Sequence, residues 1–285
     1  MCSVVDKRQQ DGALRRRQAM GGFTLVELIV VTVLGSLVVM ASLQILITNQ
    51  RTYSAQSAQI VGQQTTRAAL DVLFAELREV SPGGGDLVGM ARDSIRVRAM
   101  RKFGVVCATD LSGQPKLTVL KVGDYFTTTD SVFVFADNEE ALDSDDEWIE
   151  SINANQVDTT GITCGTEPAQ EITFSGYRAL FVADSVRLGA PVRSYVYYTY
   201  MLYQYGSDFY LGRREANNTS VLPLVGPLRP RDGLEFSYRD EDGNVTTVAT
   251  DVRQIVVTIR TGSEVLNSLG ELVSDSITSW VYTRN

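Results

Sequence analysis

One carboxylate in this sequence lies where a charge needs a chemical reason. Glu27 is the only charged residue between Phe23 and Gln50, in a run of apolar and small polar residues. A carboxylate inside a bilayer or a protein core is costly unless a positive group compensates it. We therefore expect a specific counter-charge for Glu27. The alternative is that its side chain reaches the lipid headgroups from one helical turn inside the membrane.

The element that must hold Glu27 is a helix of membrane length. Phe23 to Thr48 spans 26 residues, or about 39 Å as an α-helix, which is enough to cross a bilayer. Residues 1–22 carry five basic and two acidic side chains, a net charge of +3. This basic flank predicts that the N-terminus stays in the cytoplasm and that the C-terminal part of the chain crosses the membrane.

Three interpretations of the N-terminal segment compete. The first is a secretory signal peptide, with Val39–Ala41 as a small-residue cleavage site. The second is a plain single-span anchor, and neither of these gives Glu27 a role. The third starts from the stretch Gly22–Glu27 (GFTLVE), which follows a basic leader and resembles the class III leader junction of type IV pilins and type II secretion pseudopilins. We favour the third, because it explains the Gly-Phe junction and the carboxylate together.

This resemblance implies a maturation step and an assembly chemistry. A prepilin peptidase would cut between Gly22 and Phe23, remove the leader 1–22 and N-methylate Phe23. The new α-amine would be close to +1 at neutral pH. Glu27 would pair with the amine of a neighbouring subunit in the apolar filament core, which would also set the axial register. The implied partners are the prepilin peptidase/N-methyltransferase, other minor and major pilins, and the bacterial inner membrane, with the head in the periplasm.

Composition argues against an enzyme. The 285 residues include no histidine, which excludes Ser-His-Asp and Cys-His catalysis and the usual zinc sites. The net charge of -8 disfavours a nucleic-acid binder. We therefore expect no catalytic residue, no cofactor, no metal and no nucleic-acid partner. The acid-rich run Asp137–Glu150 could hold Ca²⁺, but it lacks the turn glycine of a calcium loop, which favours a solvated loop.

The helix is expected to continue beyond the membrane as far as Val80. Residues 23–48 would form its transmembrane and filament-core part, and residues 49–81 its amphipathic periplasmic continuation, which ends at Pro82 and three glycines. Apolar residues with helical spacing predict a stripe that packs onto a head. These residues are Leu70, Leu73, Phe74 and Leu77. Major pilins carry a helix-breaking proline where this chain has Gln44, so the residue that favours local unwinding of the helix is missing here.

Residues 82–285 are expected to form a β-rich head. From Asp86 onward the apolar pattern alternates with period 2, and Tyr205–Asp208 and Asp240–Gly243 are typical of hairpin turns. The expected fold class is α+β, with a long N-terminal helix packed on an antiparallel, pilin-like head. The expected strands are Ser94–Ala99, Leu117–Val122, Val132–Ala136, Glu171–Phe174, Tyr195–Tyr203, Phe209–Arg214, Leu234–Tyr238, Ile255–Arg260 and Ile277–Tyr282.

Cysteine usage is consistent with an exported head. Removal of the leader removes Cys2 and leaves Cys107 and Cys164. In an oxidising periplasm two cysteines suggest a disulfide. The alternative is two separate buried thiols, since sequence alone does not show that the two residues are close together.

The second half of the chain carries a weaker resemblance, over Val182 to Asn285. It is similar to minor pilins of the PilW type, and the J-type minor pseudopilins of type II secretion (GspJ) share the middle of the pattern. The similar segments are Val192–Tyr203, Phe209–Arg214, Leu234–Tyr238, Arg253–Val257 and Arg284–Asn285. The resemblance implies a minor type IV pilin that helps to initiate or caps a pilus filament. The alternatives are a J-type minor pseudopilin and, from another class, a membrane-anchored adhesin module that binds DNA or glycan.

Two groups of residues bear on the adhesin alternative. Several basic residues share one parity of an expected strand and could face DNA or lipid, although a charged outer strand face is the simpler interpretation. They are Arg92, Arg96, Arg98 and Lys102. Tyrosines are dense between Tyr195 and Tyr205, and their alternation favours core packing or subunit contacts over a glycan platform.

Overall fold

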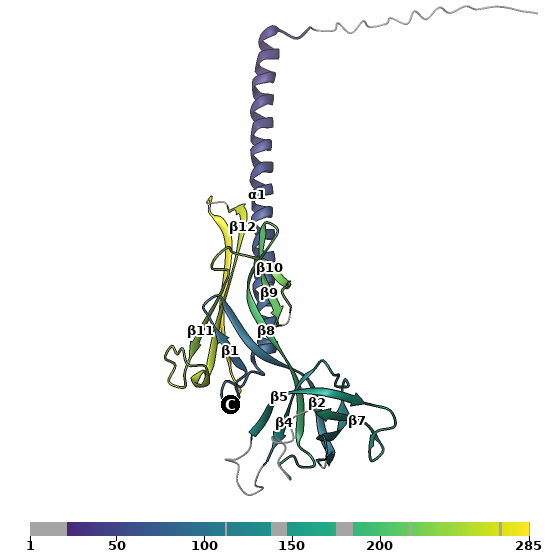
Figure 1. Ribbon diagram of the computed structural model, residues 1–285. Helices are drawn as coiled ribbons and strands as arrows, with labels where there is room; N and C mark the ends of the chain where they lie inside the picture. Colours follow the sequence, from purple (N-terminus) through teal and green to yellow (C-terminus); the bar gives the residue numbers. More distant parts are fainter. Residues whose placement is uncertain are drawn as a thin grey trace, which may run out of the picture. The chain divides into compact units, whose positions relative to one another are not determined.

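The computed structural model describes residues 22–111, 113–137, 147–174, 185–216, 218–267 and 270–284. The chain divides into two compact units, one ending at Tyr53 and the other beginning at Ser54. One α-helix, α1 (Leu25–Leu77), contributes to both units, and the second unit adds a large antiparallel β-rich head (Figure 1). The expected α+β fold class, with a long N-terminal helix packed on antiparallel sheet, is confirmed.

The helix α1 begins at a capped turn and runs without a break. The Thr24 Oγ1 accepts a hydrogen bond from the backbone N–H of Glu27 at 3.2 Å, which satisfies one of the free donors of the first turn. The helix continues through Gly35 and Gln44. It ends at Leu77, three residues before the expected end, where Pro82 and the glycines follow.

Within the second unit, one face of α1 is buried. The buried residues recur every three or four positions, which is the period of a helix face that packs on a sheet. They are Gly62, Thr65, Thr66, Ala69, Leu70, Leu73 and Leu77. Phe74, expected in the same stripe, is only half-buried. A Cβ atom at Gly62 would lie 2.9 Å from the Thr261 Oγ1, so glycine is what allows the small sheet to approach the helix here.

The strands of the head form a ten-stranded sheet and a three-stranded sheet, both antiparallel. The large sheet consists of β1 (Leu87–Met90), β2 (Ser94–Asp110), β3 (Lys116–Val122), β4 (Ser131–Ala136), β5 (Glu147–Asp158), β6 (Thr163–Cys164), β7 (Glu167–Phe174), β8 (Pro191–Tyr205), β9 (Asp208–Glu215) and β10 (Val221–Leu228). The small sheet consists of β11 (Leu234–Arg239), β12 (Gln254–Leu266) and β13 (Leu272–Tyr282).

Part of the large sheet closes on itself. The pairings run β2–β3–β7–β5–β4–β8, and β8 returns to β2, so six strands form a closed ring. The ring holds its own core, which includes Val119, Val134, Ile172, Phe174 and Val192. Closure leaves these strands without free edges, which limits unwanted pairing with other chains.

A second core joins the helix to both sheets. It contains Leu73 and Leu77 of α1, Ile95 of β2, Tyr200 of β8 and Ile255 of β12, all fully buried. The long strands β2 and β8 contribute to both cores, because their first and last halves pair with different neighbours. This arrangement explains why β2 is 17 residues long, whereas period-2 alternation predicted only its first six residues.

All nine expected strands lie within strands of the structure. The sequence did not predict β1, β5, β6 and β10. The strand β10 contains Pro223, Gly226 and Pro227, which are typical of turns. Because β10 is the last strand of the sheet, one side of it needs no hydrogen-bonded partner, and prolines are tolerated there.

Candidate assembly site

Residues 25–48 of α1 form a largely apolar surface that nothing in the described chain covers. Every residue from Gly22 to Ser54 is exposed, including Phe23 with 79% of its surface accessible. The helix is long and apolar enough to cross a membrane. An apolar surface of this extent is not stable in water, so it requires lipid or other apolar helices around it.

The hydroxyl side chains of residues 25–43 are all hydrogen-bonded within the helix. Thr32 donates to the Leu28 carbonyl at 3.0 Å, and Ser36 and Ser42 likewise donate to carbonyls about one turn earlier. Such hydroxyls add little cost in an apolar environment, because their hydrogen bonds are made locally. Between Leu25 and Leu43, Glu27 is therefore the one polar side chain without a bond inside the helix.

Glu27 lies in the first turn of α1, two residues after the helix begins. A negative charge is favoured at this end, because the free N–H groups of the first turn carry partial positive charge. Among the described residues, no positive side chain forms an ion pair with Glu27. Gly22 and Phe23 lie just before the helix, in exposed non-helical chain. The structure thus places Gly22, Phe23 and Glu27 together at one end of the exposed helix.

In the head, the sulfur atoms of Cys107 and Cys164 form a disulfide. Their Cα atoms are 6.0 Å apart, within the usual range for a bonded pair. Cys107 lies in β2 and Cys164 in the short strand β6, which pairs only with β7. The bond therefore fastens the small β6–β7 hairpin to the wall of the closed ring.

The expectation of a charged outer face along β2 is wrong for Arg98. This residue is 3% exposed, and its Nε lies 2.8 Å from the Asp86 Oδ1, while a second nitrogen bonds the Gly84 carbonyl. Its guanidinium also lies 4.6 Å from the centre of the Phe133 ring. Asp86 accepts a further bond from the Ser81 N–H at 2.9 Å, so both charges are well hydrogen-bonded. Burial nevertheless raises the pKa of the Asp86 carboxyl above its usual value.

The other expected members of the basic stripe have different environments. Lys102 pairs with Asp130 at 2.6 Å, and Arg92 pairs with Glu235 at 2.8 Å. A bulge between Met100 and Lys102 shifts the register of β2, so parity does not carry through the strand. Of the four residues in this stripe, only Arg96 is exposed and forms no ion pair with another described residue.

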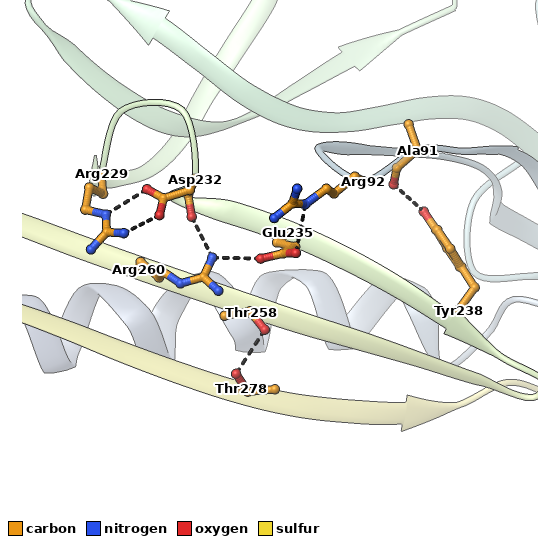
Figure 2. Close-up of polar contacts among 9 residues, drawn as sticks. All are labelled: Ala91, Arg92, Arg229, Asp232, Glu235, Tyr238, Thr258, Arg260 and Thr278. Atoms are coloured by element: carbon orange, nitrogen blue, oxygen red, sulfur yellow. Dashed lines mark hydrogen bonds and ion pairs between the residues drawn. The ribbon is translucent and has the colours of Figure 1, made fainter. Parts of the chain in front are cut away.

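A network of charged side chains lies between the Arg92 turn and the small sheet, and the sequence did not reveal it. Figure 2 shows Arg92 and Arg260 on either side of Glu235, at 2.8 and 2.9 Å. Arg260 also donates to the Asp232 carbonyl at 2.9 Å, and Asp232 accepts from Arg229. The two arginines beside Glu235 lower the pKa of its carboxyl, and Arg229 does the same for Asp232. Arg92 precedes β2 and Glu235 lies in β11, so this one exposed pair connects the two sheets, whereas the other contacts lie within the small sheet and the turn before it.

The head has a free strand edge at β13. The strand β13 pairs only with β12, and alternate side chains of β13 face outward. None of the outward residues is charged, and they include Trp280 and Tyr282, which are 56% and 68% exposed. Most natural edge strands carry charges or proline at such positions. Asp275, which bonds Thr66 of α1, is the one charged residue of β13, so little in this strand blocks pairing of its free edge with another chain.

The tyrosines of β8 alternate as expected. Tyr195 and Tyr197 lie on one face, with ring centres 5.4 Å apart, whereas Tyr200 is fully buried in the core beside α1. Of the acidic run Asp137–Glu150, residues 138–146 lie outside the described residues. Within the described ranges, no cluster of acidic residues and cysteines could hold a metal ion.

Comparison of the chain with protein-family models, with curated proteins and with solved structures yields no match. No activity therefore transfers to this chain from a relative. The functional assignment rests on Gly22, Phe23 and Glu27 and on the exposed apolar helix that follows them.

Proposed function

We propose that this chain is a minor subunit of a type IV pilus, similar to the PilW type, which helps to start or to cap the filament. The observation that carries the proposal is the exposed apolar helix with one unpaired carboxylate, Glu27, in its first turn. A lipid bilayer alone would cover the apolar surface. It would not explain a carboxylate five residues after the Gly22–Phe23 junction.

The proposed chemistry of assembly is a charge pair in an apolar environment. Cleavage before Phe23 creates an α-amine, and Glu27 of a neighbouring subunit supplies the opposite charge. A buried charge without a partner costs several kcal/mol, on the order of 3–5 in proteins, whereas a well-bonded pair is close to neutral. A subunit one step out of register leaves both charges unpaired. The pair therefore selects the axial position of the helix, while the apolar surface supplies the attraction.

The surface of the head is consistent with a subunit whose role is to bind other subunits. Its six-stranded ring has no free strand edge, and the edge strand β13 of the small sheet carries exposed aromatic residues. These features support contacts with other filament subunits on a limited part of the head.

The first test is the N-terminal mass of the protein recovered from membranes. A chain that begins at Phe23 with one added methyl group supports the proposal. A chain that begins at Ser42 indicates a conventional signal peptide, and an intact Met1 indicates a plain anchor. Either of these results contradicts the proposal.

The second test replaces Glu27 by glutamine, which keeps the shape of the side chain and removes its charge. We expect Glu27→Gln to be cleaved and methylated normally but to be depleted at least tenfold from sheared filaments. Thr32→Val is the matched control, because its hydroxyl is bonded within the same helix and should not contribute to assembly. Incorporation of Glu27→Gln at the wild-type level would rule out the charge pair.

A further inference from the structure

The large sheet of the head carries a hollow of about 590 Å³. It lies on the side away from α1, because Arg96 and Thr199 line it whereas their neighbours Ile95 and Tyr200 are buried in the core that includes α1. Four strands form its floor in one continuous row, because Gly89 of β1 pairs with Arg96 of β2, Arg96 with Thr199 of β8, and Thr199 with Arg214 of β9. Gly89 and Ala216 leave space between the longer side chains. The volume is within the range of sites for small molecules, about 300–1,000 Å³.

Two arginines face this hollow without a counter-charge. Arg96 and Arg214 flank Thr199, and neighbouring strands lie about 4.8 Å apart, so the two Cα atoms are separated by roughly 10 Å. No lining residue is acidic. Neither arginine forms an ion pair within the described part of the chain. Like charges in one row of a sheet repel each other, so an anion between them would relieve the repulsion.

Three nearby arginines outside the hollow are paired with carboxylates, unlike Arg96 and Arg214. Arg92, Arg98 and Arg101 each have a carboxylate partner at 2.8 or 2.9 Å. Arg96 instead lies over the ring of Tyr197, with 5.4 Å between the guanidinium carbon and the ring centre. The ring restricts the motion of the guanidinium group, so less freedom would be lost when a ligand binds.

We propose that this hollow binds a small molecule that carries a phosphate monoester. A phosphate dianion balances two guanidinium charges, and its oxygens can accept hydrogen bonds from both sides, whereas one arginine is enough for the two oxygens of a carboxylate. The Thr199 hydroxyl lies between the two arginines and can donate a third bond. The hollow is larger than one phosphate, which leaves room for the organic part of the ligand.

The test is titration calorimetry of the full chain in a non-ionic detergent, at constant ionic strength set with chloride. The probes are inorganic phosphate, phenyl phosphate as a monoester, and a short oligothymidylate as a phosphodiester. We expect saturable binding of phosphate and phenyl phosphate, with phenyl phosphate the tighter ligand. The double variant Arg96→Ala/Arg214→Ala should weaken binding at least tenfold, and Arg96→Lys/Arg214→Lys should restore only part of the affinity, because lysine lacks the planar fork.

The control is Arg67→Ala/Arg78→Ala, which removes two exposed arginines outside the hollow and should bind like the wild type. Thermal unfolding of each variant verifies that the head remains folded. The proposal is overturned if phosphate and phenyl phosphate do not bind saturably, or if the alanine double variant binds them as the wild type does. Tighter binding of the oligothymidylate than of phenyl phosphate would overturn the assignment to a dianion.

Discussion

The buried pair between Arg98 and Asp86 leads to a prediction with a defined magnitude. Arg98→Met keeps most of the side-chain volume but removes the charge and the bonds to Asp86 and to the Gly84 carbonyl. The side chains of Arg98 and Asp86 are only 2% and 6% exposed, so water can compensate the remaining carboxylate very little. Loss of one partner of a buried pair costs about 3–5 kcal/mol of unfolding free energy. The contact of Arg98 with the Phe133 ring is lost as well.

The loss of unfolding free energy caused by Arg98→Met should depend on pH in a specific direction. Burial raises the pKa of Asp86 in the folded state, so the folded protein binds this proton more tightly than the unfolded chain does. The stability contributed by the protonated form is present below the unfolded pKa, and it is lost as the pH rises through the folded pKa. Without Arg98 the folded pKa rises further. The deficit of Arg98→Met should therefore be larger at pH 8 than at pH 5, and each unit of pKa shift corresponds to about 1.4 kcal/mol.

Urea unfolding of the full chain in detergent, followed by near-ultraviolet circular dichroism, measures this deficit. Arg96→Met is the matched control, because Arg96 lies two residues away on the same strand and is exposed. Its unfolding free energy should change by less than about 0.5 kcal/mol. The double variant Arg98→Met/Asp86→Asn should recover part of the loss, because no charge is left buried. Equal effects of Arg98→Met and Arg96→Met, or a deficit independent of pH, would refute this reasoning.

Two further predictions concern the head. Cys107→Ser/Cys164→Ser should lower the unfolding free energy by about 4 kcal/mol, because the disulfide closes a loop between residues 57 positions apart. Urea midpoints measured with and without a reducing agent test this. A wild-type protein whose midpoint does not change with the reducing agent would contradict it. Glu235→Gln should flatten the loss of melting temperature between pH 7 and pH 3, because Arg260 and Arg92 hold the folded pKa of Glu235 below its usual 4.5 and that contribution disappears as the pH falls. An unchanged pH profile of melting temperature would count against this role of Glu235.

Much of the fold follows from local patterns in the sequence. The apolar run from Phe23 and the stripe at Leu70, Leu73 and Leu77 predict the long helix and its buried face, and both patterns depend only on neighbouring turns. Alternation located nine strands for the same reason. It failed at β10, where Pro223 and Pro227 are typical of a turn and only the position at the sheet edge makes a strand possible.

The candidate assembly site could be predicted almost entirely from the sequence. Gly22, Phe23 and Glu27 lie within six residues of one another, so their spacing along the chain is enough to predict a cleavage junction and a carboxylate without a local partner. The structure adds that Glu27 lies in the first helical turn and that no described residue covers the helix around it.

The tertiary structure alone decided which charges are buried and which are open. Arg96 and Arg98 have the same parity on one strand, yet Arg98 pairs with Asp86 in the interior and Arg96 faces a hollow with Arg214. The closure of the six-stranded ring and the approach of Cys107 to Cys164 were likewise set by the pairing of distant segments. The physical reason is that strand register between remote parts of the chain depends on the packing of the whole core, whereas helix length and strand alternation depend only on adjacent residues.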